Sequence, residues 1–221
     1  MREVADAMAA AREGVATPRG RLRVAAPLLF SQLALGRLSA RFMAAYPEVT
    51  VEVVAEDRIV DLVDERFDVA IRPNPRQDNT LVGRCFARDT LVVAAAPSVP
   101  IPVVEHDNPI PVPAVVMNYR EGELWSVDGG RLTLEPRPVM HLSSLLMVRD
   151  AVIAGGGVAL LPESILWAPL AQGKLVQWGK SGKDVELWVL HTSRRLPSPK
   201  VRAFVDFLCD QFPAGMLTLR G

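Results

Sequence analysis

The sequence predicts an α/β fold with two lobes, and three observations carry this expectation. The chain has 221 residues, a length that suits one large domain or two small ones. After Gly20, strand-like segments and helix-like segments follow one another in turn. The strand-like segments have apolar residues at every second position, and the helix-like ones have them with a 3.6-residue period. This alternation is typical of a mostly parallel sheet covered by helices. Residues 97–113 then contain six prolines, which exclude a helix and indicate an extended crossing between two lobes.

In the first half of the chain, the pattern predicts a βαβαββ unit. Helix periodicity over 31–46 comes from Leu35, Leu38, Phe42 and Tyr46. Asp57 is expected to cap a short helix that carries Ile59, Leu62, Val63 and Phe67 on its apolar face. The expected strands are residues 21–27, 49–53, 68–72, 81–86 and 90–96.

The second half repeats the pattern after the proline-rich stretch. Two short strands around Asp128-Gly129-Gly130 indicate a hairpin. A helix is expected from Ser144 to Ala154, ended by Gly155-Gly156-Gly157, and a last helix from Ser198 as N-cap with Pro199 in its first turn. The expected strands are residues 114–119, 124–127, 131–134, 139–142, 158–162, 175–178 and 185–190.

Composition excludes several classes of protein. The 25 basic and 25 acidic side chains give a net charge of zero, whereas a face that binds phosphates needs a surplus of Lys and Arg. A chain with 23% charged and 49% apolar residues is expected to fold rather than to be disordered. No run of about 18 apolar residues is present, and the charged, Ala-rich N-terminus lacks the apolar core of a secretory signal. We therefore expect a soluble cytoplasmic protein with no membrane partner.

An ordered set of motifs resembles the effector-binding domain of LysR-type transcriptional regulators. The segments are GRLRVAAPLLF, FMAAYPEVTVEVVAEDRIVDLVDERFDVAIR, LVVAAAPS, AVIAGGGVALLP and SPKVRAFVDFL, and they cover nearly the whole chain from Gly20 onward. The resemblance implies a periplasmic-binding-protein-like fold of type II, with two Rossmann-like subdomains and an interlobe cleft. It further implies that residues 1–19 end a linker helix, that residues 20–97 and 192–221 form subdomain I, and that residues 98–191 form subdomain II. The winged helix-turn-helix of such regulators has no counterpart in this sequence, so DNA is expected to be bound only through that absent domain.

Two departures from the family pattern bear on the ligand. The family usually has a further short helix where this chain has the proline-rich 97–113 stretch. Family members of this branch also often carry Ser or Thr just after the AP of the first strand, where this chain has Leu28-Leu29. The second departure removes a polar contact and argues against a strongly polar effector.

No constellation of residues indicates an enzyme. Neither GxSxG nor HExxH is present, and the three histidines are scattered, so no catalytic residue, metal site or cofactor is expected. Gly155-Gly156-Gly157 follows a helix and precedes a strand, the reverse of a phosphate-binding loop, and indicates a helix stop with close backbone packing. Cys85 and Cys209 are expected to be ordinary buried thiols, and the alternative is a role in sensing oxidants. The alternative to a regulator is a free-standing solute-binding protein of the same fold.

Residues that follow strands or begin helices are the expected binding residues, because ligands bind at the carboxyl ends of strands in α/β folds. Arg72 can hold a carboxylate in two hydrogen bonds, and its structural alternative is a surface salt bridge. The hydroxyls and free N–H groups at the helix start near Ser144 can bind an anion, and their structural alternative is a plain N-cap. The full set expected to contact a small, partly apolar, carboxylate-bearing effector is Pro27, Leu28, Leu29, Phe30, Arg72, Pro73, Asn74, Tyr119, Trp125, His141, Ser143 and Ser144.

The remaining expected partner is a second copy of the chain, in a homodimer or homotetramer. The helix over 31–46 carries Ala40 and Ala44 opposite its apolar stripe, a small-residue face suited to close packing. The resemblance places this helix and the strand over 49–53 against the 144–154 helix of a partner, head to tail. Such a contact is isologous and closes as a two-fold dimer.

Overall fold

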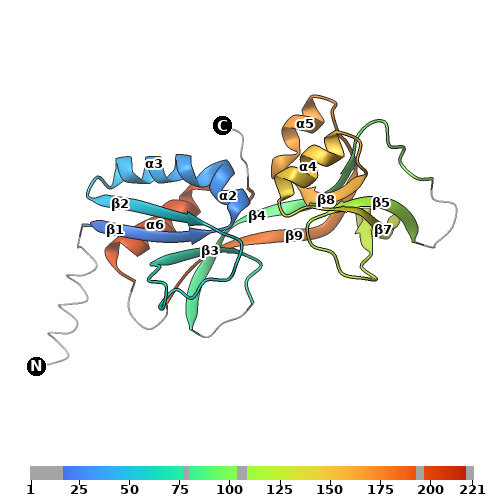
Figure 1. Cartoon of the computed structure of the whole chain (residues 1–221). Coiled ribbons are helices and arrows are strands. Elements are labelled where there is room, and N and C mark those ends of the chain that lie inside the picture. Colours follow the sequence, from blue (N-terminus) through green and yellow to red (C-terminus); the bar gives the residue numbers. More distant parts are fainter. Residues whose placement is uncertain (1–16, 77–79, 104–108, 193–196, 218–221) are drawn as a thin grey trace, which may run out of the picture. The chain divides into compact units, whose positions relative to one another are not determined.

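The computed structural model describes residues 17–76, 80–103, 109–192 and 197–217, so most of the expected linker helix lies outside the described residues. The chain forms two compact units (Figure 1). The first unit runs to Ala87 and resumes at Glu186–Met216, and the second comprises Arg88–Val185 with Leu217. The chain therefore passes from one unit to the other within two long strands, β4 (Leu81–Ala95) and β9 (Val176–Thr192). The sequence pattern places these crossings instead at 97/98 and 191/192.

The sheet of the first unit contains the first three strands expected from the sequence. β1 (Gly20–Ala26) lies between β2 (Val49–Ala55) and β3 (Val69–Pro73) and is parallel to both. β3 then pairs antiparallel with the C-terminal part of β9, from Ala70↔Leu190 to Pro73↔Leu187. The sheet is therefore mixed, because β9 returns the chain in the opposite direction.

Aromatic packing joins the helices of this unit. The Phe42 ring of α3 (Gly36–Ala45) meets the Phe204 ring of α6 (Pro199–Gln211) edge-on, with centroids 5.1 Å apart, and both rings are fully buried. Ser198 precedes α6 as expected, although its side chain makes no capping hydrogen bond. Burial of this pair explains why the i, i+3, i+7 apolar spacing predicted both helices correctly.

The first helical run begins three residues earlier than the sequence pattern indicates. It comprises α2 (Leu28–Phe30), the π-helical turn η1 (Ser31–Leu35) and α3. The Leu28 N–H, which has no partner within the helix, donates to the Asp57 carboxylate at 3.0 Å. Because this acceptor is 29 residues away, local sequence could not reveal the early start.

The expected helix over 57–67 is wrong. The segment forms successive turns instead, and Asp57 caps Leu28 rather than a helix of its own. The buried apolar side chains also differ from those expected. Val60 and Leu62 are each 4% exposed, whereas Ile59 and Val63 are 79% and 62% exposed. Val60 and Leu62 pack with Phe67 on Ala25 and Ala70 of the sheet. This segment therefore covers its side of the sheet with a loop where a helix was expected.

Three pairs of expected strands are in fact continuous, and two of these pairs form the long strands β4 and β9. Residues 81–86 and 90–96 belong to the single strand β4, and residues 175–178 and 185–190 belong to β9. The polar residues that suggested a break have partners along the strand: the buried Asp89 carboxylate accepts from the Ser164 N–H at 3.1 Å, and the Thr90 hydroxyl donates to Asp184 at 2.9 Å. These bonds let the strands continue through residues that usually mark turns.

The second unit contains the expected hairpin, helix and buried strand. β6 (Trp125–Val127) pairs antiparallel with β7 (Leu132–His141), which absorbs the two strands expected over 131–142, and the 3-10 turn η2 (Asp128–Gly130) joins them. β5 (Ile110–Val116) starts inside the proline-rich stretch, earlier than expected, and lies parallel to β7 and β8 (Val158–Pro162). β8 also pairs antiparallel with β4. The remaining elements are α4 (Leu145–Ile153), η3 (Glu163–Ile165) and α5 (Trp167–Ala171).

The three consecutive glycines end α4, as expected. Gly155 and Gly157 have φ values of +85° and +140°, which side chains rarely adopt. A Cβ on Gly157 would lie 2.6 Å from the Pro113 carbonyl oxygen of β5. The motif is therefore a helix stop with close backbone packing. None of the described helices is long and apolar enough to cross a membrane.

Candidate functional site

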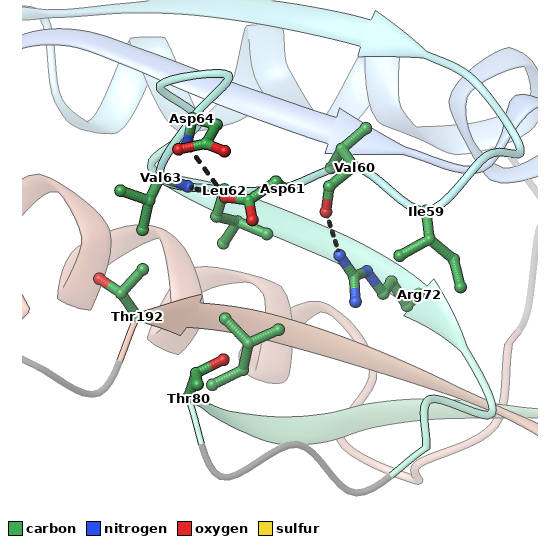
Figure 2. A pocket seen from close by; sticks show the side chains of 10 residues that line it. Ile59, Val60, Asp61, Leu62, Val63, Asp64, Arg72, Thr80 and Thr192 are labelled. Atoms are coloured by element: carbon green, nitrogen blue, oxygen red, sulfur yellow. Dashed lines mark hydrogen bonds between the residues drawn. The ribbon is translucent and has the colours of Figure 1, made fainter.

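Arg72 lies at the end of β3, half-buried, and the described residues use little of its hydrogen-bonding capacity. Its Nη2 donates to the Val60 carbonyl oxygen at 2.5 Å (Figure 2). Within the described part of the chain, no carboxylate oxygen lies within 4.0 Å of its guanidinium group. A guanidinium carries five N–H donors, so donors remain for a ligand. The salt bridge that was the structural alternative for Arg72 is not formed with any described residue.

A cavity of about 460 Å³ opens beside Arg72 in the first unit. Its volume is within the range of roughly 300–1,000 Å³ that is usual for small-molecule sites. Figure 2 shows the Asp61 and Arg72 side chains on different parts of the wall, with Thr80 and Thr192 across from them. The lining residues are Ile59, Val60, Asp61, Leu62, Val63, Asp64, Arg72, Thr80, Leu81 and Thr192.

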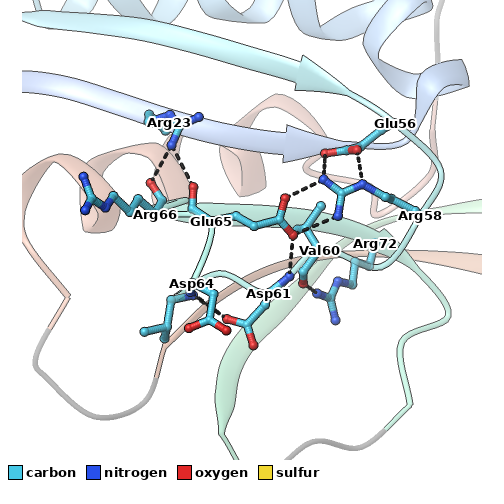
Figure 3. A network of polar contacts seen from close by, with 10 residues as sticks. Arg23, Glu56, Arg58, Val60, Asp61, Asp64, Glu65, Arg66 and Arg72 are labelled. Carbon is cyan, nitrogen blue, oxygen red and sulfur yellow. Dashed lines mark hydrogen bonds and ion pairs between the residues drawn. The ribbon is translucent and has the colours of Figure 1, made fainter.

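Arginine side chains hold the loop that forms most of this wall. Arg23 Nη1 of β1 donates to the Glu65 carbonyl oxygen at 2.8 Å (Figure 3). The Arg58 guanidinium pairs with the carboxylates of Glu56 and Glu65, and this pairing lowers the pKa of Glu65 and raises that of Arg58. The loop is therefore tied to β1 and to itself by charged hydrogen bonds.

Asp61 is held rigidly within the loop. Its Oδ1 accepts from the backbone N–H groups of Val63 and Asp64, at 2.8 and 2.9 Å. Its own N–H donates to Glu65 Oε1 at 3.0 Å. These bonds fix one carboxylate oxygen as a turn cap and leave Oδ2 without a hydrogen bond to any described residue.

The other predicted residues of the first unit lie apart from this cavity's lining. Phe30 is buried against Phe86, with ring centroids 5.6 Å apart. Asn74, at φ +42°, exchanges two 2.8 Å hydrogen bonds with the backbone of Glu186 and so fixes a turn. The remaining residues are half-buried Pro27, Leu28 and Leu29 and exposed Pro73.

The five predicted residues of the second unit fall into two groups. Trp125 is 6% exposed and packs in the unit's hydrophobic core, against which half-buried Tyr119 also packs. His141 and Ser143 are exposed at the end of β7 and before α4, and Ser144 is the N-cap, with its hydroxyl oxygen accepting from Leu146 N–H at 3.3 Å. None of these five residues lines the cavity beside Arg72.

Sequence reasoning missed every residue of the cavity lining except Arg72. The reason is the incorrect helix over 57–67, in which Asp61 was expected, with Asp57, as a charge at the positive N-terminal end. The two threonines come from distant parts of the chain, and no local signal marks them. Asp61 and Asp64, the two acidic residues in the otherwise apolar run over 59–64, were the available indication.

Comparison with known proteins identifies the family. The profile described as "LysR substrate binding domain" matches residues 16–213. The chain belongs to this family. The LysR substrate-binding domain has the type II periplasmic-binding-protein-like α/β fold that the sequence resemblance implied.

Three relatives illustrate the match. The chain is 28% identical over 214 residues to the HTH-type transcriptional regulator PtxR of Pseudomonas aeruginosa, covering 93% of this chain and 69% of PtxR. It is 29% identical to an HTH-type transcriptional regulator of Xanthomonas campestris, covering 94% of this chain and 64% of that protein. The regulatory domain of CrgA from Neisseria meningitidis has a similar structure, with a TM-score of 0.72, 22% identity, and coverage of 88% of this chain and all of that one.

These relatives decide between the two functions that the sequence left open. The chain spans about two thirds of the length of the regulators that it matches. The matched region is the effector-binding domain of LysR-type regulators, so the interpretation as a free-standing solute-binding protein is not supported. The relatives are transcriptional regulators, a class that is generally not enzymatic.

Proposed function

We propose that this LysR substrate-binding domain is the effector-sensing and oligomerising part of a cytoplasmic bacterial transcriptional regulator. The effector is a small, partly apolar carboxylic acid, and Arg72 binds its carboxylate. The observation that carries the effector class is the half-buried Arg72 guanidinium, which faces a cavity of about 460 Å³ with no carboxylate partner among the described residues. A small molecule shifts a regulator between states only if it binds one state more tightly than the other.

Physical chemistry favours a carboxylate over a sugar at this wall. A planar guanidinium presents paired donors that match the two oxygens of a carboxylate. Ile59, Leu62 and Val63 add apolar surface beside it, whereas a sugar would need more hydroxyl and amide partners. A small carboxylic acid with a hydrocarbon chain can pair with Arg72 and cover the apolar side chains at the same time.

The effector class is tested by a thermal-shift screen of small acids, followed by calorimetry on wild type and Arg72→Ala. The substitution removes charge-assisted hydrogen bonds, so binding is expected to weaken by roughly 1.5–3 kcal/mol. Arg202→Ala is the matched control, because Arg202 is an exposed arginine on α6 of the same unit. Hits that are all neutral or cationic, or unchanged binding to a folded Arg72→Ala variant, would contradict the assignment.

Ser144→Ala and Ser143→Ala test the residues predicted in the second unit. Ser144→Ala is expected to cost about 1 kcal/mol of stability through loss of the N-cap. Ser143 makes no capping hydrogen bond to α4, so its substitution separates a ligand contact from a structural effect. Weaker acid binding in Ser143→Ala with unchanged stability supports the predicted contact, and unchanged binding contradicts it.

We further propose that the chain self-associates through α3 and β2. Ala40, Ala44 and Met43 are exposed on α3, and β2 is an edge strand of its sheet. An isologous contact with α4 of a second copy would cover both elements and close as a two-fold dimer. Light scattering at micromolar concentration should give more than the 24.1 kDa of one chain. A single 24.1 kDa species would contradict self-association.

DNA recognition is assigned to a domain other than this one. The chain has a net charge of zero, which provides no surplus of cations for phosphate contacts. A gel-shift assay at moderate salt is expected to show no retarded band. Sequence-selective retardation by this chain would overturn the proposal that it is only the sensing part.

A further inference from the structure

The cavity beside Arg72 carries charges of both signs, and this goes beyond what a simple carboxylic acid requires. We infer that it binds a zwitterionic amino acid with a compact aliphatic side chain, its carboxylate on Arg72 and its ammonium group on Asp61. The inference rests on the proposed function, since it names the acid that the first unit takes. Three features of the wall support it.

The first feature is the separation of the two charges. Asp61 and Arg72 both line the cavity, but their charged groups are more than 4.0 Å apart, because no ion pair forms between them (Figure 2). Opposite charges on one wall that do not neutralise each other match a ligand that carries both charges. A plain carboxylate would satisfy Arg72 and leave Asp61 facing a group of its own sign.

The second feature is the preorganisation of Asp61. Its Oδ1 is fixed by the N–H groups of Val63 and Asp64, so the direction of the carboxylate is set before a ligand arrives. The Oδ2 atom has no hydrogen bond to a described residue and can accept from an ammonium group. Asp64 also lines the cavity and adds a second negative charge nearby. Preorganised acceptors improve affinity because less ordering is needed on binding.

The third feature is the apolar surface beside the charged groups. Leu62 is buried beneath the cavity, and Ile59 and Val63 are largely exposed at its edge. Covering an exposed isoleucine and valine with a ligand side chain removes apolar surface from water, which favours binding. Aliphatic amino acids such as leucine, isoleucine and valine present such a side chain together with both charges.

The test compares ligands that share one carbon skeleton. L-leucine carries both charges, 4-methylpentanoate lacks the amino group, and L-leucine methyl ester lacks the carboxylate charge. A thermal-shift panel of the twenty amino acids selects the tightest aliphatic ligand, and calorimetry then measures it beside its deaminated acid and its ester. Each deletion is expected to weaken binding about 10- to 100-fold, the scale of a charge-assisted hydrogen bond.

Asp61→Asn is the decisive variant. An asparagine keeps the Oδ1 acceptor of the turn and removes the charge, so the loop is retained. It should weaken the amino acid about 10- to 100-fold and leave the deaminated acid within about twofold. A purely structural role of Asp61 would weaken both ligands equally. Glu48→Gln, which removes an exposed carboxylate from the same unit, is the matched control.

The outcomes separate this inference from the proposed function. If deaminated acids bind as tightly as amino acids and depend on Arg72 but not on Asp61, the inference is wrong and the carboxylic-acid effector stands. If no amino acid in the panel stabilises the protein, or if only hydrophilic ones do, the inference is also wrong. If neither amino acids nor other small acids bind, both the inference and the proposed effector class fail.

Discussion

Gly157 offers the sharpest test of how the glycine motif works, because a neighbouring glycine serves as its control. Gly155 and Gly157 both have positive φ values, +85° and +140°. A Cβ on Gly155 would meet nothing closer than the Ser98 hydroxyl at 3.7 Å, which is ordinary contact. A Cβ on Gly157 would lie 2.6 Å from the carbonyl oxygen of Pro113, a backbone atom of β5.

These two environments set the expected magnitudes. A positive φ costs a non-glycine residue roughly 1–2 kcal/mol, so Gly155→Ala should destabilise the protein by about that amount. Gly157→Ala adds an overpacking cost of typically ~1–3 kcal/mol. The Pro113 carbonyl cannot move away freely, because the next residue, Ala114, pairs with Val158 of β8. We therefore expect a total of roughly 2–5 kcal/mol for Gly157→Ala.

Urea unfolding followed by tryptophan fluorescence measures both variants. Three of the four tryptophans belong to the second unit, and two of them, Trp125 and Trp178, are buried in its core together with Val158, so most of the signal reports the unit that contains the substitution. The shift in midpoint at constant m-value gives the change in the free energy of unfolding. Equal destabilisation by the two alanines would show that the close approach to Pro113 is unimportant and would refute the reasoning.

Three buried or capping side chains give further predictions. Burial raises the pKa of the Asp89 carboxyl, so the folded state holds this proton more tightly, and the stability that Asp89 contributes is lost as pH rises above the ordinary Asp range of about 4. Asp89→Asn should therefore gain stability relative to wild type as pH is raised from about 4 toward neutral in urea titrations, and a difference that does not change with pH would contradict this. Asp57→Ala should lower the free energy of unfolding by about 1 kcal/mol, because the Leu28 N–H loses its acceptor, whereas Asp57→Asn should lower it by only a few tenths of a kcal/mol. Thermal unfolding measures both variants, and equal losses would argue against capping. Trp125→Ala should cost roughly 3–5 kcal/mol of unfolding free energy, because its ring lies in the core. Calorimetry on the folded fraction should show unchanged acid affinity, and weaker acid binding would support the predicted contact of Trp125 with the effector.

Elements whose stability is local or periodic could be predicted from the amino-acid sequence. The apolar stripe of α3, the proline-led start of α6, the hairpin at Asp128 and the glycine stop after α4 were all expected, because each depends on residues within a few positions of one another. The ordered set of motifs also indicated the LysR family, which the match over residues 16–213 confirms. Arg72 was predicted to bind the effector from its residue type and its place at a strand end, and this stays a prediction.

Elements that depend on distant partners could be found only in the folded chain. The Leu28 N–H finds its acceptor 29 residues away at Asp57, and Arg23 of β1 binds the carbonyl of Glu65 across 42 residues. These long-range hydrogen bonds keep residues 57–66 as a loop, although their composition suits a helix. The loop in turn places Asp61 beside the Arg72 cavity. Local propensity amounts to a few tenths of a kcal/mol per residue, so a few charge-assisted bonds from elsewhere in the fold override it.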